Sequence, residues 1–141
     1  GVCLANAKLG IVHGMAGPLG GMLADAPHGM LCGSILPHAM RANIAALARL
    51  PPDDARRAEG LMRYSRLACV LTGRADATPE DAAAFVGSLV ARLGTPKLGQ
   101  MGLTRDRLDE LAAKAQRAGS TKGNAVVLTA EEISSIAQAA L

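Results

Sequence analysis

The stretch ATPEDAAAFVGSLVARLG, residues 77–94, carries a full set of signals that begin and end an α-helix. Thr78 can cap the helix, Pro79 suits the first helical position, and acidic residues in the first turn favour the positive end of the helix dipole. Apolar residues then follow at helical spacing, and Gly94 ends the segment. The stretch therefore predicts a helix with one apolar face.

Three more segments of the second half follow the same plan of a start signal and an apolar stripe. They are a helix from the PPDD stretch at 51–54 through about residue 72, one over 103–119 and one over 129–141. The last begins with a capping box, in which Thr129 is followed three residues later by Glu132. The residues expected on the buried faces of these four helices are Leu61, Ser65, Ala68, Thr72 or Leu71, Ala82, Val86, Leu89, Val90, Leu93, Leu108, Leu111, Ala112, Ala115, Ile133, Ile136, Ala137 and Ala140.

Half of the 141 residues are hydrophobic, but Tyr64 and Phe85 are the only Tyr, Phe or Trp. A core built from Ala, Leu, Ile, Val and Met favours helices, because strands are enriched in β-branched and aromatic residues. The length is that of one ordinary domain. We therefore expect residues 1–141 to form a single all-α, helical bundle-like domain, with only a weak strand candidate at 125–128.

The first half is poor in charge: residues 1–52 carry four charged side chains and residues 53–141 carry twenty-three. Such a segment is expected to be enclosed, either by the second half or by a partner. Residues 2–9 look like the end of a helix. Residues 11–24 can form a helix although its glycines and Pro18 cost stability, because small residues allow a helix or ligand to approach closely. Pro27 predicts the start of a helix to about residue 50, with a kink at Pro37.

Composition also bounds the partners and the compartment. The net charge is only +3, and the basic residues are spread through segments that also carry acidic residues. No nucleic-acid partner is therefore expected. The charge-free runs are too short to span a membrane, and no secretory signal is visible. The three cysteines are an odd number without a CxxC pair, which indicates a reduced, cytoplasmic setting. Each cysteine is interpreted as a small buried apolar residue.

Two of the three histidines, His13 and His28, lie in a glycine-rich stretch with little charge. A single histidine in an apolar segment is more often part of the core, and that interpretation stays open for both. They come from different segments joined by a Gly- and Pro-rich turn, so they can converge, and each is followed by a glycine that leaves room near the ring. Two neutral imidazoles make half of a site for a divalent metal such as Fe or Zn. His38 lies about three turns beyond His28, too far to share the ion, and is interpreted as structural.

Four stretches, VHGMAGPLGG, APHGM, ILPHAMRAN and STKGNAVVLTAEEISSIAQAAL, resemble the iron-containing alcohol dehydrogenase family over essentially the whole chain. The resemblance implies an all-helical C-terminal domain that faces an N-terminal NAD(P)-binding domain, with a divalent metal, typically Fe or Zn, in the cleft between them. The metal polarises the substrate oxygen while hydride passes to or from the coenzyme. In this family one Asp and three His hold the metal, and the last two histidines map onto His13 and His28.

The resemblance also implies what this chain lacks. The family's Asp ligand, its first His ligand and its coenzyme domain would all precede residue 1, so no catalytic or coenzyme-binding residue is expected here. Many members carry a further histidine four residues after the one at His13, where this chain has Gly17. The chain alone is therefore expected to be inactive, and whether it is an enzyme by itself stays open.

Two functions remain in competition at this point. In the first, the chain is the C-terminal helical domain of a metal-dependent NAD(P) alcohol dehydrogenase or aldehyde reductase and works with a separate dinucleotide-binding domain. In the second, it is a free-standing, non-catalytic helical module that forms a homo-oligomer through its charge-poor face. A weaker third interpretation is a small-molecule or metal-binding protein that uses a cleft between His13 and His28. An in-frame dinucleotide-binding domain upstream in the DNA would decide for the first.

Overall fold

The computed structural model describes residues 6–141, and all regular secondary structure in that range is helical. This confirms the all-α fold expected from the composition. The α-helices are α2 (Ile11–Met22), α3 (His28–Ala48), α4 (Ala55–Thr72), α5 (Pro79–Arg92), α6 (Leu108–Arg117) and α7 (Ala130–Ala139). Two short 3-10 helices, η1 (Arg105–Arg107) and η2 (Gly119–Gly123), flank α6.

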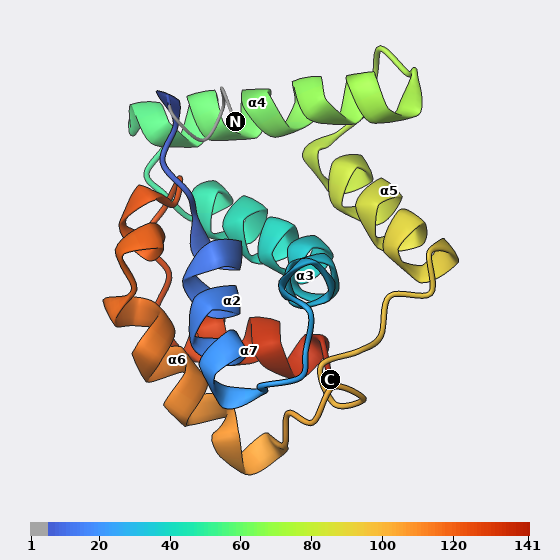
Figure 1. Cartoon of the computed structure of the whole chain (residues 1–141). Helices are drawn as coiled ribbons and strands as arrows, with labels where there is room; N and C mark the ends of the chain where they lie inside the picture. Colours follow the sequence, from blue (N-terminus) through green and yellow to red (C-terminus); the bar gives the residue numbers. More distant parts are fainter. Residues whose placement is uncertain (1–5) are drawn as a thin grey trace.

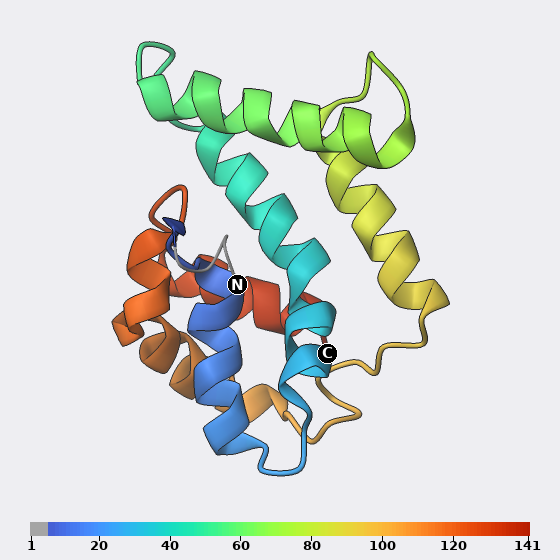
Figure 2. The same cartoon turned by 45° about the horizontal axis from the view of Figure 1, so that its top comes forward.

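Helix α3 is the centre of the fold and separates two packing groups (Figures 1 and 2). On one side it packs against α2 and α7, and α6 contacts both of these helices. On the other side α4 lies across the end of α3, and α5 returns beside α3 (Figure 2). The charge-poor helix α3 is thus enclosed by other helices over most of its length, whereas one face of α2 and the start of α3 are exposed, so the enclosure expected from composition is only partial.

The apolar side chains form two cores that share α3. The larger core joins α2, α3, α6 and α7, and its fully buried members include Met15, Leu19, Leu31, Leu111 and Ile133. The smaller core lies between α3, α4 and α5 and is built mainly of alanines with two larger residues of α3. Because Leu61 and Tyr64 on α4 pack against both cores, this helix connects the two packing groups.

The predicted caps lie at the observed helix ends. Helix α5 begins with a capping box in which the Thr78 backbone N–H donates to the Asp81 carboxylate at 2.8 Å. Helix α7 begins with the predicted box of Thr129 and Glu132. Helix α4 ends at Gly73, whose φ of 72° lies in the left-handed region that favours glycine.

The predicted buried faces are confirmed for α6 and α7, where all the expected positions are buried. The stripe predicted for α5 is wrong in its second half, because Leu89 is 42% exposed and Leu93 is 72% exposed. Helix α5 packs on α3 and α4. Its buried residues are Ala82 and Ala83, and Gly87 lies beside Pro37 of α3, so the covered face of the helix leaves Leu89 and Leu93 exposed.

Three other expectations concern the loops and the first half. Residues 125–128 form no strand; they are irregular, and Val127 is 85% exposed. Residues 11–22 do form a helix, and α3 continues through Pro37 without interruption. The helix end expected at 2–9 lies mostly outside the described residues. Within the described part of the chain, no helix is long and apolar enough to cross a membrane.

Candidate metal site

His13 lies in the first turn of α2, and a side chain from the far end of the chain holds that turn in place. Gly10 precedes the helix and provides no side-chain cap. Instead, the first backbone N–H of the helix, that of Ile11, donates to the Asn124 side-chain oxygen at 3.2 Å. Asn124 therefore satisfies one of the backbone donors that a helix start leaves without a partner. The position of His13 thus depends on the loop before α7.

Asn124 is itself fixed by Asn43 of α3. The Asn124 amide nitrogen donates to the Asn43 side-chain oxygen at 2.7 Å, and the Asn43 amide nitrogen donates back to Asn124 at 3.3 Å. Asn43 is buried, and its amide nitrogen also reaches the Tyr64 hydroxyl at 3.4 Å. This network connects α2, α3, α4 and the loop, and it sets α2 against α3.

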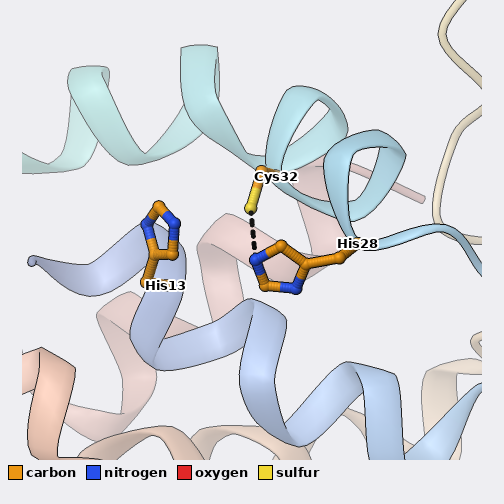
Figure 3. Close-up of side chains that lie close together, drawn as sticks. All are labelled: His13, His28 and Cys32. Carbon is orange, nitrogen blue, oxygen red and sulfur yellow. Dashed lines mark hydrogen bonds between the residues drawn. The ribbon is translucent and has the colours of Figure 1, made fainter. Parts of the chain in front are cut away.

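His28 is the first residue of α3, and Cys32 follows it by one helical turn. Residues four apart lie on the same face of a helix, so Cys32 and His28 both face the cleft toward α2 (Figure 3). The Cys32 Sγ atom lies 3.5 Å from His28 Nε2. His13 approaches from α2, with its ring centroid 5.5 Å from that of His28 and the two ring planes at 51°.

The ligand atoms of His13, His28 and Cys32 all lie within 4.8 Å of one another. Nitrogens of the two rings are therefore close enough for one ion to bond to both, with bonds of about 2.1 Å, after small adjustments. The two rings lie next to each other between α2 and α3, and neither is fully buried, which does not fit the interpretation of both histidines as core residues. Among residues 6–141 no carboxylate joins this cluster, so Asp25 does not belong to it.

The cleft is open on the side of its glycines. His28 is exposed, and His13 and Cys32 are half-buried. A Cβ atom placed on Gly17, Gly20, Gly21 or Gly29 would meet no heavy atom within 4 Å. Partial burial raises the pKa of the Cys32 thiol above its usual value. The site thus consists of two imidazoles and one thiol between α2 and α3, with free space beside the glycines.

Cys32 and Cys69 are half-buried and pack against the larger and the smaller core, as their interpretation as apolar residues expects. For Cys32 that interpretation is incomplete, because its sulfur also contacts His28. The sequence does contain the signal, a histidine followed four residues later by a cysteine on one expected helix. The same interpretation also misses a contact of Cys69, whose thiol is half-buried and donates to the Ala75 carbonyl at 3.6 Å. Cys3 lies outside the described residues.

His38 does not join the cluster. It lies on α3 about 15 Å along the axis from His28, given a rise of about 1.5 Å per residue over ten residues. Its side chain lines a separate cavity together with Arg41 and Lys97. Burial lowers the pKa of His38, and the charges of Arg41 and Lys97 lower it further.

The donor set fits a divalent transition metal. Imidazole nitrogen is a good ligand for both Zn and Fe, and a thiolate suits Zn in particular. Two or three protein donors leave coordination positions for other groups, as catalytic metal sites require. The residues present therefore suit part of an open metal centre.

The all-helical fold matches the fold of the C-terminal domain of Fe-containing alcohol dehydrogenases. The chain belongs to the Fe-containing alcohol dehydrogenase family and matches the model of its C-terminal part over residues 1–141. Among curated proteins, the chain is 35% identical over 114 residues to a 4-hydroxybutyrate dehydrogenase of Cupriavidus necator, which covers 76% of the chain.

Solved structures of alcohol dehydrogenases share the fold. The alcohol dehydrogenase of Oenococcus oeni is 31% identical, with a TM-score of 0.76 over 96% of this chain. The iron-containing alcohol dehydrogenase of Thermococcus thioreducens is 26% identical, with a TM-score of 0.70 over 94% of this chain. The chain spans 33% and 32% of those two structures and 26% of the Cupriavidus relative.

Proposed function

We propose that the chain is the metal-holding helical domain of a metal-dependent NAD(P) alcohol dehydrogenase or aldehyde reductase. In this proposal His13 and His28 are two of the ligands of a divalent ion, Fe or Zn. The observation that carries the proposal is the convergence of these two rings from different helices, with centroids 5.5 Å apart, in one open cleft. The family membership of the chain supports the same reaction class.

The bound metal would supply a Lewis acid that polarises the oxygen of an alcohol or aldehyde. The contribution of this chain is to hold the two imidazoles in place. Asn124 and Asn43 fix the start of α2, and hence His13, against α3, whose first residue is His28. Residues 6–141 place no carboxylate in the cluster, so the two imidazoles leave the positive charge of the ion to be balanced by other ligands.

The partner in this proposal is a dinucleotide-binding domain that covers the glycine side of the cleft. Such a domain would bring the coenzyme and the remaining ligands that the family resemblance implies. The open space above Gly17, Gly20, Gly21 and Gly29 supports the approach of another backbone or of a ligand. If a second copy of this chain covers that side instead, sedimentation analysis will show a stable oligomer that Gly17→Arg weakens.

Zinc titration of the purified chain, followed by calorimetry, tests the histidine pair. We expect binding at one site, with a large loss of affinity for His13→Ala and for His28→Ala. His38→Ala is the matched control, because His38 lies on α3 outside the cluster, and it should bind as the unsubstituted chain does. Equal affinity of all four proteins would overturn the proposal.

A further inference from the structure

We propose that Cys32 is a third metal ligand, so that this chain alone provides a His₂Cys donor set. This inference rests on the proposed metal site and adds a residue that the family ligand set of one Asp and three His does not contain. Figure 3 shows the Cys32 side chain directed from α3 toward the His28 ring, with His13 approaching from the opposite helix. The three side chains are the one group of potential metal ligands in the part of the chain that the structure describes.

The distances suit one shared ion. Tetrahedral zinc bonds of about 2.0–2.1 Å to nitrogen and 2.3 Å to sulfur place neighbouring donors roughly 3.5 Å apart. The Cys32 Sγ atom lies 3.5 Å from His28 Nε2. The largest separation in the cluster is below 4.8 Å, so a contraction of about 1 Å completes the set. His28 is exposed, and side-chain rotation can provide that contraction.

The backbone around the cluster leaves room for an ion. Gly29 follows His28 directly, and Gly17 lies one turn after His13 on the facing helix. Neither position has a heavy atom within 4 Å of the place where a Cβ would lie. Leu31, next to Cys32, is fully buried and anchors this turn of α3 in the larger core. The turn of α3 that carries His28 and Cys32 is therefore anchored in the larger core through Leu31 and has free space beside Gly29.

The bond that forms is between Cys32 Sγ and the ion, and the thiol proton passes to buffer. The thiolate cancels one of the two positive charges of the ion, which no carboxylate of residues 6–141 does in this cluster. A thiolate also favours Zn²⁺ and Co²⁺ over the harder Mg²⁺ and Mn²⁺. The chain should therefore bind zinc more tightly than two imidazoles alone allow, and it should discriminate against magnesium.

Cobalt titration tests the ligand directly, because a thiolate bound to Co²⁺ gives an intense charge-transfer absorption in the near ultraviolet that imidazole ligands lack. We expect this absorption in the Cys3→Ser chain, which removes the thiol outside the described residues. Adding Cys32→Ser should abolish the absorption and weaken zinc binding by about tenfold or more. Adding Cys69→Ser, at the half-buried thiol on α4, should change neither.

A second measurement does not depend on the folding of the Cys32 variant. In the unsubstituted chain, zinc should slow the alkylation of Cys32 by iodoacetamide, but not that of Cys69, as read by mass spectrometry. His13→Ala should abolish the protection. Cobalt bound without the charge-transfer absorption, or alkylation of Cys32 unaffected by zinc, would overturn the role of Cys32 and leave the histidine site standing. Failure of the chain to bind either metal would overturn both proposals.

Discussion

Asn43 and Asn124, which are 81 residues apart, exchange two hydrogen bonds through their side-chain amides. The Asn124 oxygen also accepts from the Ile11 backbone N–H, and its nitrogen also donates to the Val126 carbonyl at 2.8 Å. One amide thus holds the start of α2, the middle of α3 and the loop before α7. This arrangement positions His13 without contacting it.

Asn124→Ala should lower the free energy of unfolding by about 1–3 kcal/mol, because the side-chain oxygen of the buried Asn43 loses its donor and the Ile11 N–H loses its acceptor. Urea denaturation measures the change. Gln116→Ala, which removes an exposed amide from α6, should stay within about 0.5 kcal/mol. Equal stabilities of the Asn124→Ala and Gln116→Ala variants would contradict the role of Asn124 in capping α2.

The two glycines Gly14 and Gly17 of α2 should respond in opposite directions to alanine. A Cβ on Gly14 would collide with the Thr121 side chain, whose hydroxyl is held by the Ala115 carbonyl at 2.6 Å. Gly14→Ala should therefore destabilise the fold by about 1–3 kcal/mol. Gly17 faces open space, so Gly17→Ala should stabilise the helix by about 0.5–1 kcal/mol. Denaturation midpoints of the two variants that shift in the same direction would contradict this packing.

His38 should make the fold less stable in mild acid. Its pKa in the folded chain is lowered from 6.5, first by burial and then by Arg41 and Lys97. The unfolded chain therefore takes up the proton first as the pH falls through about 6.5, and stability is lost from there down through the lower folded pKa.

Urea denaturation at about pH 7.5 and 5.5 measures this effect, since only the unfolded histidine keeps its ordinary pKa. The unsubstituted chain should lose more stability on acidification than His38→Gln. Salt should reduce the part of the difference that comes from Arg41 and Lys97 and leave the part that comes from burial. Equal losses for both proteins would show that His38 does not contribute.

The purified chain alone should neither oxidise alcohols with NAD or NADP nor reduce aldehydes with their reduced forms. The reason is that the coenzyme site and the further metal ligands of the family belong to another domain in our proposal. Spectrophotometric assays at the coenzyme absorption band, with added Zn²⁺ or Fe²⁺, check this expectation. Turnover above that of a His13→Ala, His28→Ala double variant would reject it.

The residues that begin and end the helices could be predicted because caps act over three or four positions. The Thr78–Asp81 and Thr129–Glu132 boxes and the left-handed Gly73 are complete within their own segments. The buried face of α5 could not be predicted in the same way. Which of its apolar residues are covered depends on the side from which α3 and α4 approach, and this approach places Gly87 beside Pro37 and leaves Leu89 and Leu93 exposed.

The candidate metal site could likewise be predicted only in part from the sequence. The sequence by itself determined that His13 and His28 lie in two adjacent helices with little charge and room near each ring, because composition and glycine positions are local properties. Only the tertiary structure decided that Cys32 turns its sulfur to His28 and that His13 meets them, since this depends on how α2 crosses α3. That crossing is set by the larger core and by the Asn43–Asn124 pair, contacts whose partners are far apart in the chain.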